Sequence, residues 1–530
     1  MSDFTKTACD LPDDIDALKA LVLSNQQQLV AKDTHISLLE EKLRLALLKR
    51  FGASSEHSHK DQLHLFNEAE VESTPPESDK DCEVDIASTG KNDTQRTKKP
   101  GRKPLPAHLP RVRIEHDIPE ADKVCGCGRC KSKIGEETSE QLDIIPAQFQ
   151  VLQHVRFKYA CRHCEGTEDD GLTVITALMP PQPIPKSNAS PSLLAYITTA
   201  KFCDGIPLYR QEKMFPRIEM DLPRSTMGGW MIHGGGTLIV PLIKRFEGAI
   251  CDYDILQMDE TPIQVLKEKG RAATSKSYMW VRRGGPPDQP VILFNYDPSR
   301  SGRVPAQLLI NYKGILQTDG YEGYGGVAQR DDIISIGCLA HARRKFDEAL
   351  KAQQKKGRGG YAKQGFAFMQ RLYAIERKAR EHGLDGDARK TLRQEKAKPI
   401  WDELRQWLNG VLNQVPPQTL TGKALGYLEK QWPRLIRSLD DGRVEVDNNL
   451  CENAIRPFCL GRKNWLFADT PAGAEASANL YSLIETAKVN GLEPYAYLKQ
   501  VFTELPVAVA AEDEAAIQRL LPWNVAAIDA

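Results

Sequence analysis

The region between Asp254 and Cys338 constrains the fold more than any other part of the sequence. It alternates short apolar, β-rich segments with glycines, prolines and acids, a pattern typical of strands bounded by turns. Three such segments come first, then a helix-like segment, then two more β-rich segments. In order they are residues 254–266, 277–284, 289–297, 303–312, 314–320 and 331–338. This order predicts a mixed sheet with helices packed on it.

The size and composition indicate a multidomain globular protein. The chain has 530 residues, too many for one ordinary core, so we expect about three or four units. Lysine plus arginine and aspartate plus glutamate are balanced at 71 each, so a nucleic-acid surface has to be a local patch. The sequence shows neither a secretory signal nor the roughly 18 apolar residues of a membrane span. We therefore expect a cytoplasmic protein without a membrane partner, whose twelve cysteines are thiols or metal ligands.

A heptad pattern near the start predicts a coiled coil over residues 11–52. Its seam is Leu18, Val22, Asn25, Leu29, Lys32, Ile36, Leu39 and Leu43. Polar residues at core positions such as Asn25 and Lys32 fix register and strand number at some cost in stability. The pattern favours a homo-oligomer, although its short length also fits a lone amphipathic helix.

Residues 53–108 are expected to form a disordered linker, acidic first and then basic. The basic part leads into the run RTKKPGRKPLPAHLPRVR at residues 96–113. A stiff, solvated connector is one interpretation. The other is a DNA-binding arm that places Arg102 in a minor groove.

Two cysteine pairs predict a zinc-binding module over residues 109–178. Cys127 and Cys130 form one C-x-x-C, and Cys161 and Cys164 form the other. Paired thiolates of this kind can close a tetrahedral zinc site, although the gap between the pairs exceeds the usual 15–20 residues or so. Alternation in residues 149–160 suggests strands in that gap. Cys125 is a substitute ligand, and reduced cysteines without metal are the alternative.

Three short helical segments follow, at residues 192–205, 207–217 and 222–233. Three helices with tight turns fit a helix-turn-helix module over residues 179–238, in which Arg224 and Ser225 open the recognition helix and Ser225 caps it. A small structural helical bundle fits the same pattern.

Three carboxylates are candidates for a metal site. Asp259 is expected near the end of one strand and Asp319 at the end of another, where open α/β sheets place their ligands. Glu452 lies in the stretch VDNNLCENAIRPFCLGRKNWLF, which begins at Val446 and predicts a helix that kinks or stops at Pro457. Converging carboxylates suit Mg²⁺ or Mn²⁺. For Glu452 alone, an ion pair with Arg456 is the simpler interpretation.

The chain resembles transposases of the insertion sequence 66 family along nearly its whole length. The matching stretches are LLKRFGASSE, IGEETSEQLDIIPAQFQV with the flanking cysteine pairs, DGIPLYRQE, MDETPIQVL, LQTDGYEGY, CLAHARRKF, DNNLCENAIRPFCLGRKNWLF and LLPWN. The family usually has a single C-x-x-C in the first cysteine pair, whereas CGCGRC at residues 125–130 admits two pairings.

The resemblance implies a multidomain α+β protein with an RNase-H-like catalytic domain. The domain would span residues 239–490, with a helical insertion at about residues 339–440 and a C-terminal helical tail over residues 491–530. The family's D-D-E triad maps onto Asp259, Asp319 and Glu452, which would hold two Mg²⁺ or Mn²⁺ ions.

The implied function is a DNA transposase that binds the terminal inverted repeats of its element and catalyses strand cleavage and strand transfer. Its partners would be the element ends, target DNA and possible small accessory proteins, and it would join the bacterial nucleoid when bound to DNA. The alternatives are an inactive DNA-binding relic of a transposase and an RNase-H-like nuclease.

Several further residues are candidates for DNA contacts. Arg343, Arg344 and Arg456 are basic residues near the expected site, while Lys463 and Trp465 offer cation and stacking contacts. A core position for the tryptophan fits equally well. Cys338 and His341 resemble a C-x-x-H motif of related transposase insertions, but the sequence shows no partners for a second metal site.

Overall fold

The computed structural model describes residues 14–51, 113, 148–160, 174–352 and 360–525. Residues 72–153 separate from the rest as a unit of their own. Its described residues, 113 and 148–153, contain no helix or strand. All elements below belong to the other unit.

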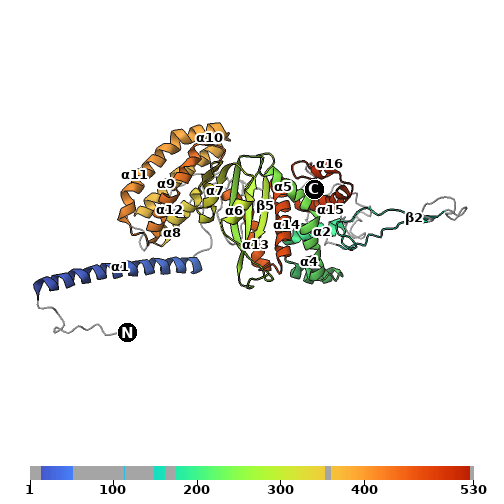
Figure 1. Ribbon diagram of the computed structural model, residues 1–530, viewed down its shortest axis with the longest axis horizontal. Helices are drawn as coiled ribbons and strands as arrows, with labels where there is room; N and C mark the ends of the chain where they lie inside the picture. The colour runs from blue at the N-terminus through green and yellow to red at the C-terminus, as the bar shows by residue number, and fades with distance from the viewer. Residues whose placement is uncertain (1–13, 52–112, 114–147, 161–173, 353–359, 526–530) are drawn as a thin grey trace, which may run out of the picture. The chain divides into compact units, whose positions relative to one another are not determined.

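A five-stranded mixed sheet forms in the region where the sequence predicts one (Figure 1). Its strands, in chain order, are β3 (Ile255–Gln264), β4 (Lys276–Gly284), β5 (Val291–Asp297), β6 (Gly314–Gln317) and β7 (Ile333–Ile336). The spatial order is β5-β4-β3-β6-β7. β4 runs antiparallel to both β3 and β5, whereas β6 runs parallel to β3 and β7. The prediction of a mixed sheet with helices is confirmed.

Helices cover both faces of this sheet. Trp280 and Val281 are consecutive residues of β4 and are both fully buried, although consecutive side chains of a strand point to opposite faces. The helices within and around the sheet region are α5 (Val240–Ala249), α6 (Arg303–Leu308), α7 (Gly325–Ala328), α13 (Asn449–Trp465) and α14 (Pro471–Val489).

Helix α14 also closes the β5 edge of the sheet. The Thr486 hydroxyl accepts a hydrogen bond from the Ile292 amide at 3.0 Å, and the Ser482 hydroxyl accepts one from the Phe294 amide at 2.8 Å. These side chains occupy the amides that an additional strand would otherwise pair with.

Each of the three short segments predicted at residues 192–205, 207–217 and 222–233 contains most of one helix. These helices are α2 (Pro191–Phe202), α3 (Leu208–Met214) and α4 (Arg224–His233). Helix α2 contacts the C-terminal α15 (Pro494–Ala510), which is followed by α16 (Glu514–Arg519).

The prediction that Ser225 caps α4 is wrong. The N-cap is Pro223, which has no side chain to accept a bond. Instead, the first amide of the helix, that of Arg224, donates to the Glu212 carboxylate of α3 at 2.8 Å. A tertiary contact thus replaces the local cap that the sequence suggested.

A helical segment interrupts the chain between β7 and α13. It contains α8 (Leu339–Lys351), α9 (Tyr361–Glu381), α10 (Gly386–Leu392), α11 (Lys398–Val411) and α12 (Leu420–Leu435). These helices share an apolar core that includes Phe346, Met369 and Leu404, all fully buried. The segment leaves and rejoins the sheet region at one place, since the Leu339 amide donates to the Val446 carbonyl at 3.0 Å.

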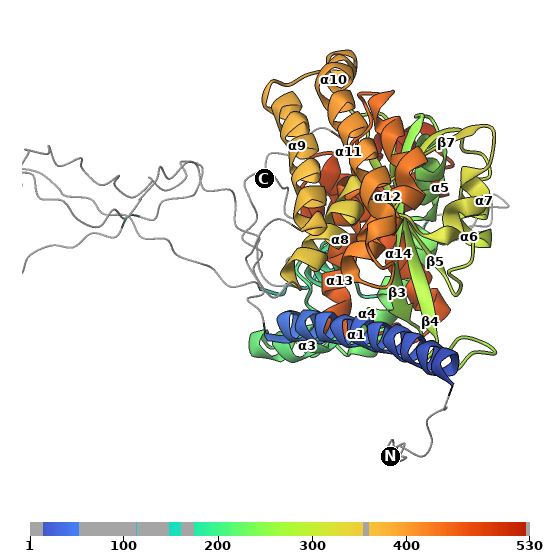
Figure 2. The ribbon, with the colours of Figure 1, turned by 90° about the vertical axis from the view of Figure 1, so that its left-hand side faces the viewer.

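Near the N-terminus, α1 (Ile15–Phe51) forms one unbroken helix (Figure 2). Five apolar residues of the predicted heptad seam are at least half exposed: Val22, Leu29, Ile36, Leu39 and Leu43. The chain itself therefore leaves this seam largely uncovered.

A two-stranded antiparallel sheet lies at the predicted zinc module. It pairs β1 (Lys158–Ala160) with β2 (Val174–Thr176), and β1 falls within the alternating stretch at residues 149–160. Within the described ranges, every helix is too short or too polar to cross a membrane.

Candidate active site

The sheet brings Asp259 and Asp319 to one place. In the parallel pairing of β3 and β6, Gln257 lies opposite Gln317, and each aspartate follows its glutamine by two residues. Side chains two apart in a strand share a face. Asp319 follows the end of β6, as predicted, whereas Asp259 lies in the middle of β3 rather than near its end.

The position of Asp259 has a simple structural reason. The start of β3, Ile255 to Gln257, pairs with β6, whereas the rest, from Met258 onward, pairs only with β4. Asp259 therefore lies just beyond the point where the neighbouring strand ends. Asp259 thus lies at an edge because the neighbouring β6 ends, whereas β3 itself continues to Gln264.

Helix α13 supplies the third acid, Glu452, from its first turn. The residues before α13 anchor the helix to its surroundings, and the Asp447 carboxylate also accepts a local bond from the Asn449 amide at 3.2 Å. The Asn448 side chain donates to the Met258 carbonyl at 3.2 Å, and the Asp447 carboxylate accepts from the Tyr373 hydroxyl of α9 at 2.9 Å. The start of α13 is thus fixed both to β3 and to the helical segment.

Two buried glutamines tie the three acids' backbones together. The Gln257 amide donates to the Gln317 side-chain oxygen at 2.7 Å, and the Gln257 oxygen accepts from the Cys451 amide at 3.0 Å. Gln317 in turn donates to the Glu445 carbonyl at 2.7 Å. This glutamine clamp, Gln257 with Gln317, links β3, β6 and α13.

The sequence predicts a kink or a stop at Pro457, and the stop does not occur: α13 continues through Pro457 to Trp465. Proline removes the bond that the Asn453 carbonyl would have accepted. Asn453 is exposed, so water can satisfy that carbonyl.

Glu452 is buried, Asp259 and Asp319 are half-buried, and the three candidate acids are electrostatically coupled. Burial raises the pKa of Asp259 well above its usual range, and the charges of Glu260, Glu452 and Asp319 raise it further. Burial also raises the pKa of Asp319. Burial raises the pKa of Glu452 to about 7, despite the opposing charge of Arg344. Each acid is costly to ionise where it lies, and a bound cation would lower that cost.

Two side chains of α8 lie next to the Glu452 carboxylate: the cationic Arg344, and His341, whose pKa burial lowers to about 4. The Arg344 guanidinium lies 3.5 Å from Oε2, and His341 Nδ1 lies 3.6 Å from Oε1. Its Oε1 atom is buried without a hydrogen-bond partner. The predicted basic residue Arg344 is therefore part of the acid cluster itself.

A fourth acid, Glu260, lies next to Asp259 and was not predicted. It pairs with Arg300 at 2.6 Å and accepts a hydrogen bond from the Tyr324 hydroxyl at 2.5 Å. Arg300 also stacks on Tyr321, 3.8 Å from the ring centre. The cation of Glu260 is closer than that of Glu452, at 2.6 Å rather than 3.5 Å, and these contacts help to fix the loop after Asp319.

The other predicted DNA-contact residues occupy varied environments. Arg343 stacks on Phe366 of α9 at 5.1 Å. Trp465 packs edge-on against Phe458 and lies under the Lys201 ammonium at 5.4 Å. Both side chains therefore take part in packing.

The remaining predicted DNA-contact residues that the structure describes lie at or near the surface. Lys463 is exposed near the end of α13, and Arg456 is half-buried one turn after Glu452. Arg224 and Ser225 are exposed at the start of α4. Arg102, Cys125, Cys127, Cys130, Cys161 and Cys164 lie outside the described residues.

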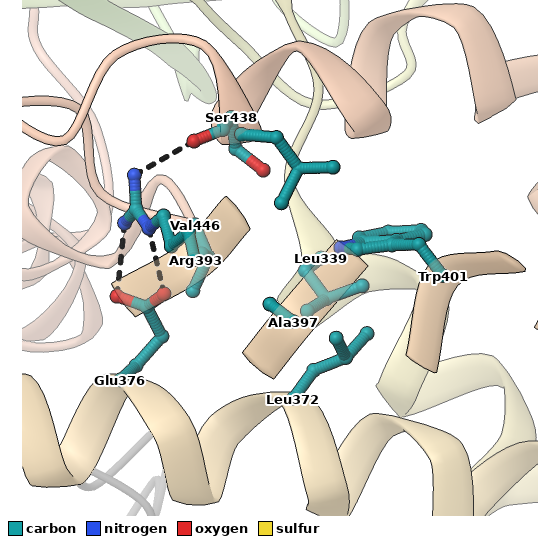
Figure 3. Close-up of a pocket in the computed structure, with 9 residues that line it drawn as sticks. Leu339, Leu372, Glu376, Arg393, Ala397, Trp401, Ser438 and Val446 are labelled. Atoms are coloured by element: carbon teal, nitrogen blue, oxygen red, sulfur yellow. Dashed lines mark hydrogen bonds and ion pairs between the residues drawn. The ribbon is translucent and has the colours of Figure 1, made fainter. Parts of the chain in front are cut away.

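A small cavity of about 10 Å³ lies in the helical segment, with room for about one water molecule. Figure 3 shows Arg393 pointing toward Glu376 and the Ser438 carbonyl on one side of this cavity. The other walls are mainly apolar. The lining residues are Leu339, Leu372, Glu376, Arg393, Ala397, Trp401, Ser438, Leu439 and Val446. The candidate acids lie elsewhere, so this cavity is separate from their site.

Comparison with protein-family models gives four matches along the chain. A model described as Transposase IS66 family matches residues 186–476, which include all three candidate acids. A zinc-finger binding domain of transposase IS66 matches residues 122–165, which include the four predicted zinc ligands. Residues 482–523 match an IS66 C-terminal element, and residues 38–114 match a model described as Transposase C of IS166 homeodomain.

Curated relatives span most of the chain. The uncharacterized protein y4qI of Sinorhizobium fredii is 32% identical over 97% of this chain and 98% of its own length. The uncharacterized protein y4hP of the same organism is 31% identical over 92% of this chain and 88% of its own length. A third, y4jD, is 33% identical over 79% of this chain and 81% of its own length.

Proposed function

Because the chain belongs to the IS66 transposase family, we propose that it is a D-D-E transposase that cleaves and joins DNA at the ends of its own element. Family membership supports a transposase with a zinc-finger DNA-binding domain. The specific chemistry proposed here is metal-dependent strand cleavage followed by strand transfer.

One observation carries the proposal. Asp259, Asp319 and Glu452 come from three distant parts of the sequence, yet the pairing of β3 with β6 and the bonds from the start of α13 to β3 bring them together, and the charges of Glu452 and Asp319 both raise the pKa of Asp259. Burying mutually repelling carboxylates is costly unless a cation compensates for them. The arrangement therefore has the features of a metal-binding site.

The donor set fits Mg²⁺ or Mn²⁺, which prefer carboxylate oxygens. By family resemblance, Asp259 would bind both ions of a pair, with Asp319 on one and Glu452 on the other. Such ions, when bound, activate a water or a 3′-hydroxyl and stabilise the leaving oxygen of an in-line displacement. The protein side chains would bind the ions and position the reacting groups, so the reaction requires no serine or tyrosine nucleophile.

The fold supports the same proposal. The strand order β5-β4-β3-β6-β7, with β4 antiparallel and β6 and β7 parallel to β3, is the arrangement expected of an RNase-H-like domain. In this fold, the first acid lies on the central strand and the second follows the neighbouring parallel strand. We place Asp259 and Asp319 in these two positions.

We propose two further DNA-binding modules. Cys127, Cys130, Cys161 and Cys164 would bind one structural zinc, with Cys125 as a substitute ligand. Arg224 and Ser225, exposed at the start of α4, would open the recognition helix of a helix-turn-helix. Arg102 and the exposed Lys463 would add contacts to the phosphate backbone of the DNA.

The exposed seam of α1 supports a coiled coil between copies of the chain. Accessory proteins of the same element remain part of the proposal through family resemblance alone, and binding to the element would place the protein on the bacterial nucleoid. The proposed domains are residues 11–52, 53–108, 109–178, 179–238, 239–490 and 491–530.

Cleavage assays on defined DNA test this function. Purified full-length protein with Mg²⁺ should nick and join DNA that carries the terminal inverted repeats and ignore matched DNA without them. Cleavage regardless of the repeats would indicate an RNase-H-like nuclease. Specific binding without cleavage would indicate a DNA-binding relic.

A further inference from the structure

A second set of metal-binding side chains lies against Glu452. Cys338 is the N-cap residue of α8, and His341 lies in the first turn of that helix. Glu452 faces them from the first turn of α13. One ligand atom from each residue lies within 4.8 Å of the other two.

Two of the three facing atoms of this cluster lack hydrogen bonds. His341 Nδ1 and Glu452 Oε1 are 3.6 Å apart, and both are buried without a hydrogen-bond partner. The Glu452 side chain is 3% exposed. Buried polar atoms without hydrogen-bond partners require an explanation, and an ion bound between them supplies one.

The spacing fits a tetrahedral transition-metal site. With Zn–N and Zn–O bonds of about 2.1 Å, tetrahedral geometry separates the two donors by roughly 3.4 Å. A Zn–S bond of about 2.3 Å places sulfur roughly 3.6 Å from either donor. The 3.6 Å separation of His341 Nδ1 and Glu452 Oε1 needs only a small adjustment.

We propose that Cys338, His341 and Glu452 bind a transition-metal ion of the Zn²⁺ class, which removes Glu452 from the catalytic triad. A sulfur and an imidazole donor select such an ion over Mg²⁺. The effect on catalysis rests on the proposed function of Glu452, whereas the binding site does not.

Binding would be coupled to proton release. The Cys338 thiol loses its proton to solvent as sulfur bonds to the metal. The Asn448 amide already donates to Cys338 Sγ at 3.2 Å, and this bond stabilises the resulting thiolate. Arg344 stays on the other carboxylate oxygen of Glu452. The protein supplies three ligands, and water completes the tetrahedron.

Zinc should therefore inhibit a Mg²⁺-dependent reaction at this site. The ion is held by the same carboxylate that the triad needs, so binding and cleavage exclude each other. The N-terminal cysteine pairs are a separate site and should hold their zinc throughout.

Equilibrium dialysis of the full-length protein with Zn²⁺, in excess Mg²⁺, tests the site. Wild type should bind one zinc per chain more than Cys338→Ser or His341→Ala. Cys451→Ser is the matched control, because Cys451 is a fully buried thiol next to Glu452 that lies outside the cluster. It should keep the wild-type stoichiometry. Equal zinc content in wild type and both cluster variants would overturn the proposal, and His341→Ala keeps the test valid if Cys338→Ser does not fold.

Two further measurements separate this inference from the proposed function. Cys338→Ser should cleave DNA in Mg²⁺ and require at least about tenfold more zinc for half inhibition. Asp259→Asn should lose cleavage but keep the additional zinc. Zinc bound at the cluster without any inhibition of cleavage would contradict the inferred competition and the role of Glu452, while leaving the site itself intact.

Discussion

The helical segment and the sheet edge both bury carboxylates, but they compensate for the charge in different ways. In the helical segment, Glu376 is bonded to Arg389 at 2.7 Å and to Arg393 at 2.8 Å. Burial alone would raise the pKa of Glu376, but its hydrogen bonds and charge interactions with these arginines outweigh that effect and lower it. At the sheet edge, burial and neighbouring acids raise the pKa of Asp259 instead.

The difference separates a structural cluster from a functional one. A buried acid with two arginines is internally neutralised and stabilises one arrangement of helices. Clustered acids with too little nearby positive charge destabilise the protein unless a ligand compensates. The Glu376 cluster also includes Glu445, which Arg389 contacts at 2.7 Å, just before the start of α13. The structural cluster thus helps to fix the segment that positions Glu452.

The largest expected effect is on catalysis at the sheet edge. Asp259→Asn and Asp319→Asn should each reduce DNA cleavage by at least about 10³-fold, because the acids act as one unit. The double variant should be little worse than either single variant. Cleavage rates from single-turnover assays check this, and multiplicative losses would mean that the two acids act independently.

The next effect is on stability in the helical segment. Arg393→Leu should lower the free energy of unfolding by about 3–5 kcal/mol, since it leaves Glu376 partly uncompensated. It also removes the donors to the Ser438, Asp441 and Val444 carbonyls. Arg405→Leu removes a more exposed pair with Glu429 and should cost about 1 kcal/mol or less. Urea denaturation compares the two, and equal losses would refute the structural role.

The pH dependence of stability should have opposite signs in the two regions. The pKa of Glu452 is raised from 4.5 in the unfolded chain to about 7, so the folded state holds the proton more tightly between these values. Without added Mg²⁺, the protonated Glu452 carboxyl contributes to the free energy of unfolding below pH 4.5. This contribution is lost as the pH rises through 7. The shift corresponds to roughly 3 kcal/mol.

Glu376 behaves in the reverse way because its folded pKa is lowered. Its contribution is present above pH 4.5 and is lost as the pH falls through the folded value. Unfolding free energies across pH for wild type, Glu452→Gln and Glu376→Gln check both signs. Parallel pH profiles in all three proteins would remove the distinction between the two clusters.

The strands and the three acids could be predicted from the sequence better than the contacts that hold the acids in place. The strand segments and their order follow from β-rich runs bounded by turn residues. The glutamine clamp could also have been found, since LQMD at residues 256–259 and LQTD at residues 316–319 repeat the same spacing. Identical side chains at matching positions of two parallel strands are expected to lie side by side.

Other features depend on tertiary contacts that the sequence pattern does not contain. The interpretation of Glu452 as a simple i to i+4 pair missed Arg344 and His341, which come from a helix more than a hundred positions earlier. The cap of α4 comes from Glu212 on another helix. The position of Asp259 within β3 depends on where β6 ends. Each of these required the folded arrangement.

A smaller effect should follow from loosening the glutamine clamp. Gln317→Leu keeps the volume but removes the bonds to Gln257 and the Glu445 carbonyl, at a cost of about 1–3 kcal/mol. Cleavage should fall and require more Mg²⁺ for half-maximal rate, because the acids lose their common support. An unchanged Mg²⁺ dependence at full folding would limit the clamp to a structural role.

The most direct test of the account is Glu452→Gln in the presence of Mg²⁺ and DNA that carries the element ends. Glutamine keeps the shape of the side chain but removes the charge that balances a metal. Cleavage and strand transfer should fall by several orders of magnitude, while end binding stays close to wild type, because binding rests on basic residues and the N-terminal modules. Retained cleavage would show that Glu452 is only an ion-pair partner of Arg344, and the proposed triad would be wrong.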